Sequence, residues 1–233
     1  MTVPAFELIA QDPRGLDVAA AVGADRIELC CALEVGGLTP SQALIDAAVA
    51  ARDAGGPGVH VLVRSRPGDF EYSPAELDLM LADAVAALQR GADGVVVGAS
   101  RDGALDLSFI DRMVAAAGDA SVTVHRVVDS LADPVGAVSS LRDRGVRRVL
   151  TSGGADKAPD GVGTIAAMVQ AAQGRIEIMP GGGVSVASVP ALIDAQVSAI
   201  HASASGNGQP DLQVARQFKA AITDHRGPRS PRS

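Results

Sequence analysis

The segment GADRIELCCALEVGGLTPS, residues 23–41, contains one complete structural unit of this chain. Its apolar stretch at 25–30 predicts a buried β-strand. The glycine pair that follows predicts a turn, and Thr-Pro-Ser-Gln at 39–42 is typical of a helix start. The unit is therefore a strand, a loop and a helix, with two adjacent cysteines, Cys30 and Cys31, where the strand ends.

Eight such units follow one another along the chain. Short β-rich runs alternate with alanine-rich helical patterns, separated by Gly, Pro, Ser or Asp. Strands are expected near residues 5–10, 25–30, 59–64, 94–98, 121–126, 147–152, 175–180 and 198–203. Helices are expected near residues 14–22, 41–54, 74–90, 107–117, 133–144, 161–172, 186–195 and 211–224. This alternation predicts an α/β fold, a single TIM (β/α)8 barrel, with an open doubly wound sheet as the alternative.

The domain organisation follows from the same pattern. No linker interrupts the alternation, so residues 1–225 are expected to form one barrel domain. The last residues, 226–233, are polar, basic and contain proline, which predicts a disordered tail.

Composition excludes several classes of function. The chain of 233 residues is 47% hydrophobic, but only 2% of its residues are aromatic and its net charge is −7. A nucleic-acid partner is not expected, because binding one needs a basic surface and stacking side chains. No apolar run reaches the length of about 18 residues that a membrane helix needs, and no secretion signal is seen. Two free cysteines fit a reducing cytoplasm.

Charged side chains are predicted to converge inside the barrel. Side chains alternate along a strand, so every second residue faces inward. The inward-facing polar residues near strand ends are Glu7, Glu28, Arg64, His125 and His201. Because barrel enzymes carry their chemistry at the C-terminal ends of the strands, Glu28, Arg64, His125 and His201 are the predicted catalytic residues. A purely structural ion-pair layer is the alternative.

Glycine-rich loops follow the last three strands, at residues 151–155, 179–185 and 201–206. Loops at the end of such barrels often bind phosphate through backbone N–H groups. The predicted anion-binding residues are Gly153, Gly182, Gly183 and Ser203. Tight turns that only need glycine are the alternative interpretation.

Several segments together resemble the CutC copper-homeostasis family. They are GADRIELC with GGLTPS, RSRPGDFEYS (64–73), VHRVVD (124–129), VLTSGG (149–154) and IMPGGGV (178–184), in the family's order. The resemblance covers most of residues 5–205. It implies a cytosolic TIM barrel that forms a homo-oligomer, handles copper and binds Cu(I), with cysteine ligands in some relatives.

The resemblance makes Cys30 and Cys31 the predicted metal ligands. Cu(I) favours soft thiolate donors, but adjacent residues of an extended strand face opposite ways. Cys30 is therefore expected at the barrel mouth, and Cys31 outward or in the loop. Two hypotheses stay open: a copper-binding homeostasis protein, and an enzyme acting on a small anionic or phosphorylated metabolite. A pure scaffold is the third.

Overall fold

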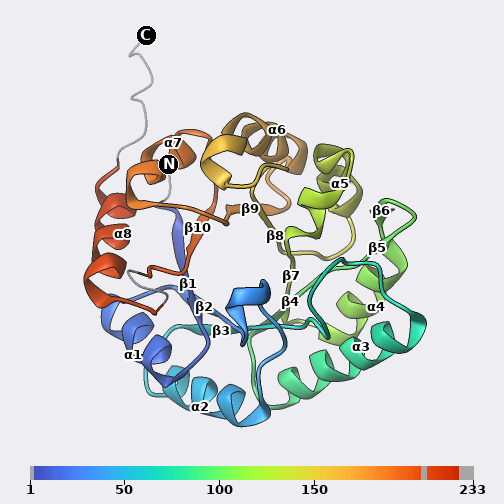
Figure 1. Ribbon diagram of the computed structural model, residues 1–233, viewed down its shortest axis with the longest axis horizontal. Coiled ribbons are helices and arrows are strands. Elements are labelled where there is room, and N and C mark those ends of the chain that lie inside the picture. Colours follow the sequence, from blue (N-terminus) through green and yellow to red (C-terminus); the bar gives the residue numbers. More distant parts are fainter. Residues whose placement is uncertain (1–2, 206–208, 226–233) are drawn as a thin grey trace.

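Eight short parallel strands form the centre of the computed structural model, which describes residues 3–205 and 209–225 (Figure 1). They are β1 (Ala5–Ala10), β2 (Arg26–Leu29), β3 (Gly58–Leu62), β4 (Gly94–Val97), β7 (Ser121–Val124), β8 (Arg148–Thr151), β9 (Glu177–Pro180) and β10 (Ala199–Ala202). Their order is β10-β1-β2-β3-β4-β7-β8-β9. The amide of Ser198 donates to the carbonyl of Ile178 at 3.0 Å, which joins the two ends of the sheet. The predicted TIM barrel is confirmed.

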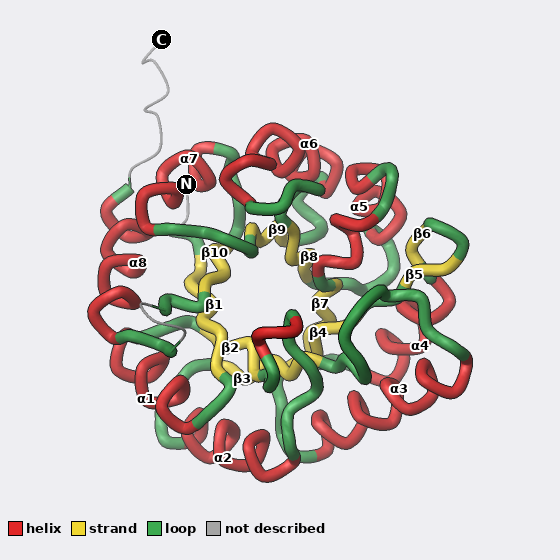
Figure 2. Tube along the Cα trace, viewed as in Figure 1, coloured by secondary structure: helices red, strands yellow, loops and turns green. Residues whose placement is uncertain are grey.

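Helices surround this barrel as an outer ring (Figure 2). Within the described chain they are α1 (Pro13–Val22), α2 (Gln42–Asp53), α3 (Pro74–Gln89), α4 (Leu107–Ala117), α5 (Pro134–Leu141), α6 (Val162–Ala172), α7 (Val189–Asp194) and α8 (Leu212–Asp224). Short polar side chains start most of them: Asp12, Ser41 and Ser73, for example, each accept a backbone N–H of the first turn. The predicted helix positions agree with these to within a few residues.

The loops contain elements that the sequence pattern did not predict. A small hairpin, β5 (Ser100–Arg101) with β6 (Ala104–Leu105), follows β4. The described residues also contain four short 3-10 helices: η1 (Leu33–Val35), η2 (Arg126–Ser130), η3 (Ala158–Gly161) and η4 (Val186–Ser188). Of these, η1 lies over the centre of the barrel in Figure 1.

Side chains alternate along the strands, so apolar residues are buried on two sides of the barrel wall: outside it, under the helices, and inside it. Outward residues such as Leu8 and Ile27 are buried between barrel and helices in one large cluster. Inside the barrel, Cys30, Leu62 and Val96 form a small apolar cluster. A second interior cluster consists of Leu150, Met179 and Ala199. The predicted inward and outward faces of the strands are therefore correct.

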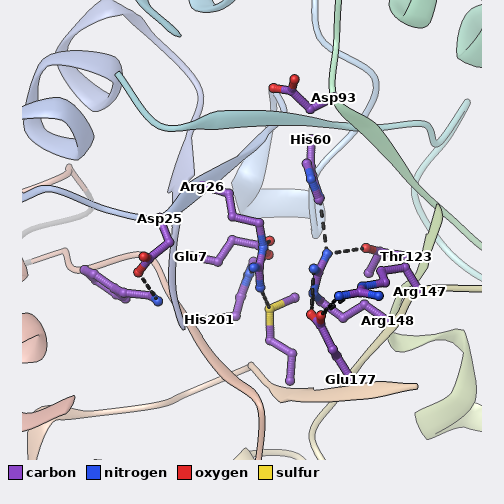
Figure 3. A network of polar contacts seen from close by, with 12 residues as sticks. Glu7, Asp25, Arg26, His60, Asp93, Thr123, Arg147, Arg148, Glu177 and His201 are labelled. Atoms are coloured by element: carbon purple, nitrogen blue, oxygen red, sulfur yellow. Dashed lines mark hydrogen bonds and ion pairs between the residues drawn. The ribbon is translucent and has the colours of Figure 1, made fainter. Parts of the chain in front are cut away.

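The N-terminal end of the barrel interior is polar (Figure 3). Arg148 donates to Glu177 at 2.9 Å and to Thr123 at 3.1 Å. Burial, together with the charges of Arg148 and Arg26, lowers the pKa of His60 to about 4, so this ring is neutral at pH 7. In barrels of this kind that end contributes stability.

No helix in residues 3–205 and 209–225 is long and apolar enough to cross a bilayer. The tail predicted at 226–233 lies outside the described residues, so its disorder and the domain limit at residue 225 stay predictions.

Candidate functional site

A pocket of about 270 Å³ opens at the C-terminal ends of the strands. Its lining residues are Ile9, Glu28, Leu33, Gly36, Leu62, Arg64, Phe70, His125, Arg126, Leu150, Gly182 and His201. All four residues predicted to be catalytic are among them. They come from β2, the end of β3, the end of β7, and β10, so the barrel brings together groups that are far apart in the sequence.

A buried chain of polar groups contacts His201: Figure 3 shows Glu7 and Arg26 beside its ring. The ring atom Nδ1 of His201 lies 2.9 Å from Oε1 of Glu7, and Arg26 Nε donates to Oε2 of Glu7 at 2.7 Å. Burial alone would raise the pKa of Glu7, but the hydrogen bond and charge of His201 and the charge of Arg26 hold it well below its usual range. Burial lowers the pKa of His201, yet the nearby carboxylates of Glu28 and Glu7 outweigh this and raise it. The Glu7 carboxylate therefore favours the charged form of the His201 ring.

Glu28 has a different environment from Glu7. Its Oε2 is buried without a hydrogen-bond partner among the described residues. Burial raises the pKa of Glu28 to about 7, and the negative charge of Glu7 adds to this, although His201 opposes it. Oxygen atoms of the two glutamates and a ring nitrogen of His201 lie within 4.8 Å of one another. Glu28 can therefore hold or release a proton near neutral pH, which suits a general acid or base.

His125 presents a neutral ring to the same pocket. Burial and the charge of Arg64 lower its pKa to about 3. Its Nδ1 accepts the amide N–H of Val127 at 3.1 Å, so in the neutral ring the proton sits on Nε2. That Nε2 is buried and has no partner within the described part of the chain. It is a hydrogen-bond donor without an acceptor.

Two glycines make room for the two histidine rings. A Cβ atom at Gly98 would lie 2.6 Å from the ring of His125, and one at Gly181 would lie 2.8 Å from the ring of His201. Any larger residue would displace the imidazole. These glycines are therefore part of the site although they carry no chemistry.

Arg64 holds the mouth of the pocket together. Its guanidinium donates to the carbonyls of Val35 and Gly37 at 3.2 Å each, and to Gly68 at 2.7 Å. Val35 and Gly37 belong to residues 31–38, which we call the mouth loop, and which includes η1. The guanidinium also lies 5.0 Å from the ring centre of Phe70. The geometry makes Arg64 a clamp on two loops. Its Nε is buried without a hydrogen-bond partner among the described residues, and the catalytic role predicted for it stays a prediction.

The structure also identifies site residues that the sequence interpretation missed. Arg126 lines the pocket, donating to Asp129 at 2.9 Å and to Ser152 at 2.7 Å. It follows the inward-facing His125 directly, so in an extended strand it would face outward. The 3-10 helix η2 ends the extended backbone at this point and returns Arg126 to the pocket. The only signal was its place in the motif VHRVVD (124–129).

The predicted anion-binding residues are divided by the structure. Gly182 lines the pocket, whereas Gly183 packs against the side chain of Lys157. The amide of Gly153 already donates to Oγ1 of Thr151 at 2.8 Å, so it is not free for an anion. Ser203 is partly exposed and is not among the pocket's lining residues.

The two cysteines are separated. Cys30 is fully buried in the interior apolar cluster with Leu62 and Val96. Burial, aided by the charge of Glu28, raises its pKa, so it stays a thiol. Cys31 is partly exposed, and its Sγ donates to the carbonyl of Thr39 at 3.2 Å. Cu(I) prefers soft sulfur donors that meet at one point, and these two sulfurs lie in different surroundings, so the cysteines as arranged do not fit that ion.

Comparison with known sequences gives one family. A model described as the CutC family matches residues 5–206. The CutC family protein of Rhizobium meliloti (strain 1021) is 42% identical over 202 residues, covering 86% of this chain and 81% of that protein. The CutC family protein of Agrobacterium fabrum is 43% identical over 215 residues, covering 91% of this chain and 84% of that protein.

Solved structures give the same fold. A CutC protein of Streptococcus agalactiae, whose assigned role in copper homeostasis is itself provisional, superposes with a TM-score of 0.80 and 28% identity. The match covers 86% of this chain and 98% of that one. A 3-hexulose-6-phosphate synthase gives a TM-score of 0.64 at 22% identity, covering 94% and 99% of the two chains. A likeness at that identity shows the barrel fold alone.

Proposed function

This chain belongs to the CutC family, and we propose that it is an enzyme that binds a small anionic metabolite in the barrel mouth and transfers a proton to or from it. One observation carries the proposal: the carboxyl group of Glu28, whose Oε2 is buried without a partner among the described residues, lies beside the ring of His201. A barrel that needed Glu28 only for stability would pair it or replace it with an apolar residue.

The proposed chemistry divides the work among three side chains. Glu28, whose pKa of about 7 leaves both forms populated at neutral pH, takes up or gives the proton. His201, whose charged form is favoured by Glu7, donates a hydrogen bond to negative charge that develops on the substrate. His125 adds a second, neutral donor through Nε2. Two fixed N–H donors and one base suit a reaction that passes through an oxyanion.

The pocket limits the substrate. Its volume of about 270 Å³ lies below the range typical of drug-sized ligands, which favours a small metabolite. Arg126 and His201 supply positive charge on its wall, which favours an anion. Leu33 and Phe70 add apolar surface to its lining, which favours a small molecule with an apolar part as well as its anionic group.

Deuterium uptake tests this proposal. The purified protein is incubated in D₂O with the small-molecule extract of bacterial cells, and mass spectrometry follows every anionic metabolite. We expect one or a few anions to gain deuterium or change in amount with the wild type and not with Glu28→Gln. If no anion responds to the wild type, or if the two proteins act alike, the proposed chemistry is wrong.

Copper handling is the second candidate function, and the family supports it, because the solved relative from Streptococcus agalactiae carries a provisional role in copper homeostasis. A cytoplasmic location and a homo-oligomer belong to this candidate as well. The nitrogen and oxygen donors of Glu7, Glu28 and His201 lie close enough for one cation, but such donors suit Cu(II) or other divalent ions better than Cu(I). Cu(I) would require Cys30 to leave its apolar cluster.

A further inference from the structure

Arg126 lines the pocket, and only part of its guanidinium is hydrogen-bonded. Its Nε donates to Oδ2 of Asp129 at 2.9 Å, and its Nη2 donates to Oγ of Ser152 at 2.7 Å. Its Nη1 has no hydrogen-bond partner in residues 3–205 and 209–225. The guanidinium lies across Gly182, where a Cβ atom would be 2.8 Å from Nη1. Both residues line the pocket, so the free edge of Arg126 is available to a bound molecule.

Asp129 holds this arginine in place and is itself held from several sides. Its carboxylate accepts the hydroxyl of Thr151 at 2.5 Å, the amide of Ser152 at 2.8 Å and the amide of Gly154 at 3.0 Å. The side chain is nearly buried, whereas that of Arg126 is 39% exposed. An arrangement with this many contacts fixes one orientation of the guanidinium.

We propose that Arg126 recognises the anionic group of the substrate, a carboxylate or a phosphate monoester, and that Asp129 and Ser152 position it to do so. This inference rests on the proposed function and names the substrate class of the same pocket. Gly182 lets the guanidinium pack closely against the backbone, and the partly exposed side chain still borders the pocket, so an anionic oxygen can approach Nη1 from the pocket side. Glu28 and His201 line the same pocket, so an anion at Arg126 would hold the rest of a small molecule against them.

The charge of Asp129 gives a test that separates positioning from simple electrostatics. Removing a negative charge near an anion site should tighten anion binding if charge alone matters. If Asp129 acts by orienting Arg126, Asp129→Asn should instead weaken binding. Ser152→Ala changes no charge and removes one partner of Arg126, so it tests positioning independently.

Calorimetric titration with inorganic phosphate, and separately with acetate, measures the subsite at fixed ionic strength. We expect Arg126→Gln to lower the affinity for the preferred anion about tenfold or more, the loss of a charge-assisted hydrogen bond. Arg147→Gln is the matched control: it removes the same charge from an exposed arginine, paired with Glu177 at the opposite end of the barrel, and should leave affinity unchanged. Preference for phosphate or for acetate identifies which anion the site takes.

The outcomes decide separate points. Equal anion binding by wild type and Arg126→Gln overturns the subsite, and tighter binding by a folded Asp129→Asn overturns the positioning role. If Asp129→Asn fails to fold, Ser152→Ala decides the second point by weakening binding or leaving it unchanged. Phosphate binding is measured without any turnover, so the subsite and the proposed proton transfer stand or fall independently.

Discussion

The ring nitrogen Nδ1 of His201 lies 2.9 Å from Oε1 of Glu7, although 194 residues separate the two in the chain. They are paired in register on the neighbouring strands β1 and β10, so the contact joins the first strand of the barrel to the last. Both side chains are buried. The same contact therefore contributes to barrel closure and fixes the ring that faces Glu28.

Glu7→Gln removes the negative charge of this pair. We expect the free energy of unfolding at pH 7 to fall by about 3–5 kcal/mol, because His201 and Arg26 then stay buried without a counterion. The pKa of Glu7 is lowered by folding, so the stability it contributes is present above its unfolded pKa and is lost as pH falls toward its folded value. Urea unfolding of wild type and variant at several pH values measures both effects.

Asp46→Asn serves as the control for this variant. Asp46 pairs with Arg90 on the exposed surface, and loss of such a pair costs at most about 1 kcal/mol. Similar losses for the two variants would show that the Glu7 pair is not a special contributor to stability.

Glu28 should titrate near neutral pH. Because folding raises its pKa to about 7, the folded state holds its proton more tightly than the unfolded state, and stability falls as pH rises from about 4.5 to about 7. A shift of this size corresponds to about 3 kcal/mol. In Glu28→Gln this part of the pH dependence should disappear, so the variant gains stability relative to wild type at pH 8 and not at pH 4.

The experiment compares the two unfolding curves across pH 4–8. A carboxylic acid band that disappears near pH 7 in the infrared spectrum of the wild type, and is absent from Glu28→Gln, gives a second and independent reading. Parallel stability curves, with no such band, would show that Glu28 is ionised throughout.

The fold could be predicted from the sequence because its signal is repeated. Each strand alternates inward and outward residues, so one pattern seen eight times gave the barrel and brought Glu28, His125 and His201 to one end of it. Long segments with regular periodicity leave few alternatives, and the glycine and proline boundaries gave the element ends to within a few residues.

The details of the site could not be predicted, because they depend on backbone outside the strands. Alternation stops where a strand ends, so the position of Arg126 in η2 was not visible. The sequence indicates that Arg64 faces the barrel mouth. It does not show that the guanidinium donates hydrogen bonds to three backbone carbonyls there. Likewise, the sequence pattern of Gly153 is that of an anion-binding glycine, but it does not show that the amide of Gly153 donates to the hydroxyl of Thr151.

Arg64→Lys should loosen the mouth loop. A single ammonium cannot donate to the carbonyls of Val35, Gly37 and Gly68 as the guanidinium fork does. We expect hydrogen exchange of the amides in residues 31–38 to rise about tenfold, the effect of losing one or two hydrogen bonds. Arg66→Lys is the control. Arg66 donates to the carbonyl of Glu71, so this substitution should loosen residues 67–71 without affecting the mouth loop. Unchanged exchange at 31–38 in Arg64→Lys would contradict the clamp.

Gly98→Ala should disturb the ring of His125. The new methyl group would lie 2.6 Å from a ring carbon of this buried histidine, and overpacking of this kind costs about 1–3 kcal/mol. The His125 signals in the proton–nitrogen NMR spectrum should shift with it. Gly163→Ala, in α6 with no atom within 4 Å of the new Cβ, should instead stabilise the protein by up to about 1 kcal/mol. A Gly98→Ala protein as stable as wild type would mean that the ring can move aside.

The cysteines should differ in reactivity. Cys30 is fully buried with a raised pKa, whereas Cys31 is partly exposed. We therefore expect a thiol reagent to modify Cys31 quickly in the native protein. This fast reaction should be absent from Cys31→Ser. Rapid modification of Cys30 would show that the interior cluster opens easily.

Competition with a Cu(I) chelator then separates the two candidate functions. Tight Cu(I) binding needs at least two soft donors, and Cys30 and Cys31 are held in different surroundings, the first in the apolar cluster and the second on Thr39. We therefore expect wild type, Cys30→Ser and Cys31→Ser to compete equally weakly. If copper is the ligand, Cys30→Ser must reduce affinity strongly, and wild-type affinity must weaken as pH falls, because a thiolate has to form before the metal binds. That result would require Cys30 to turn out of the barrel interior, and it would make copper binding the function of this chain ahead of proton transfer.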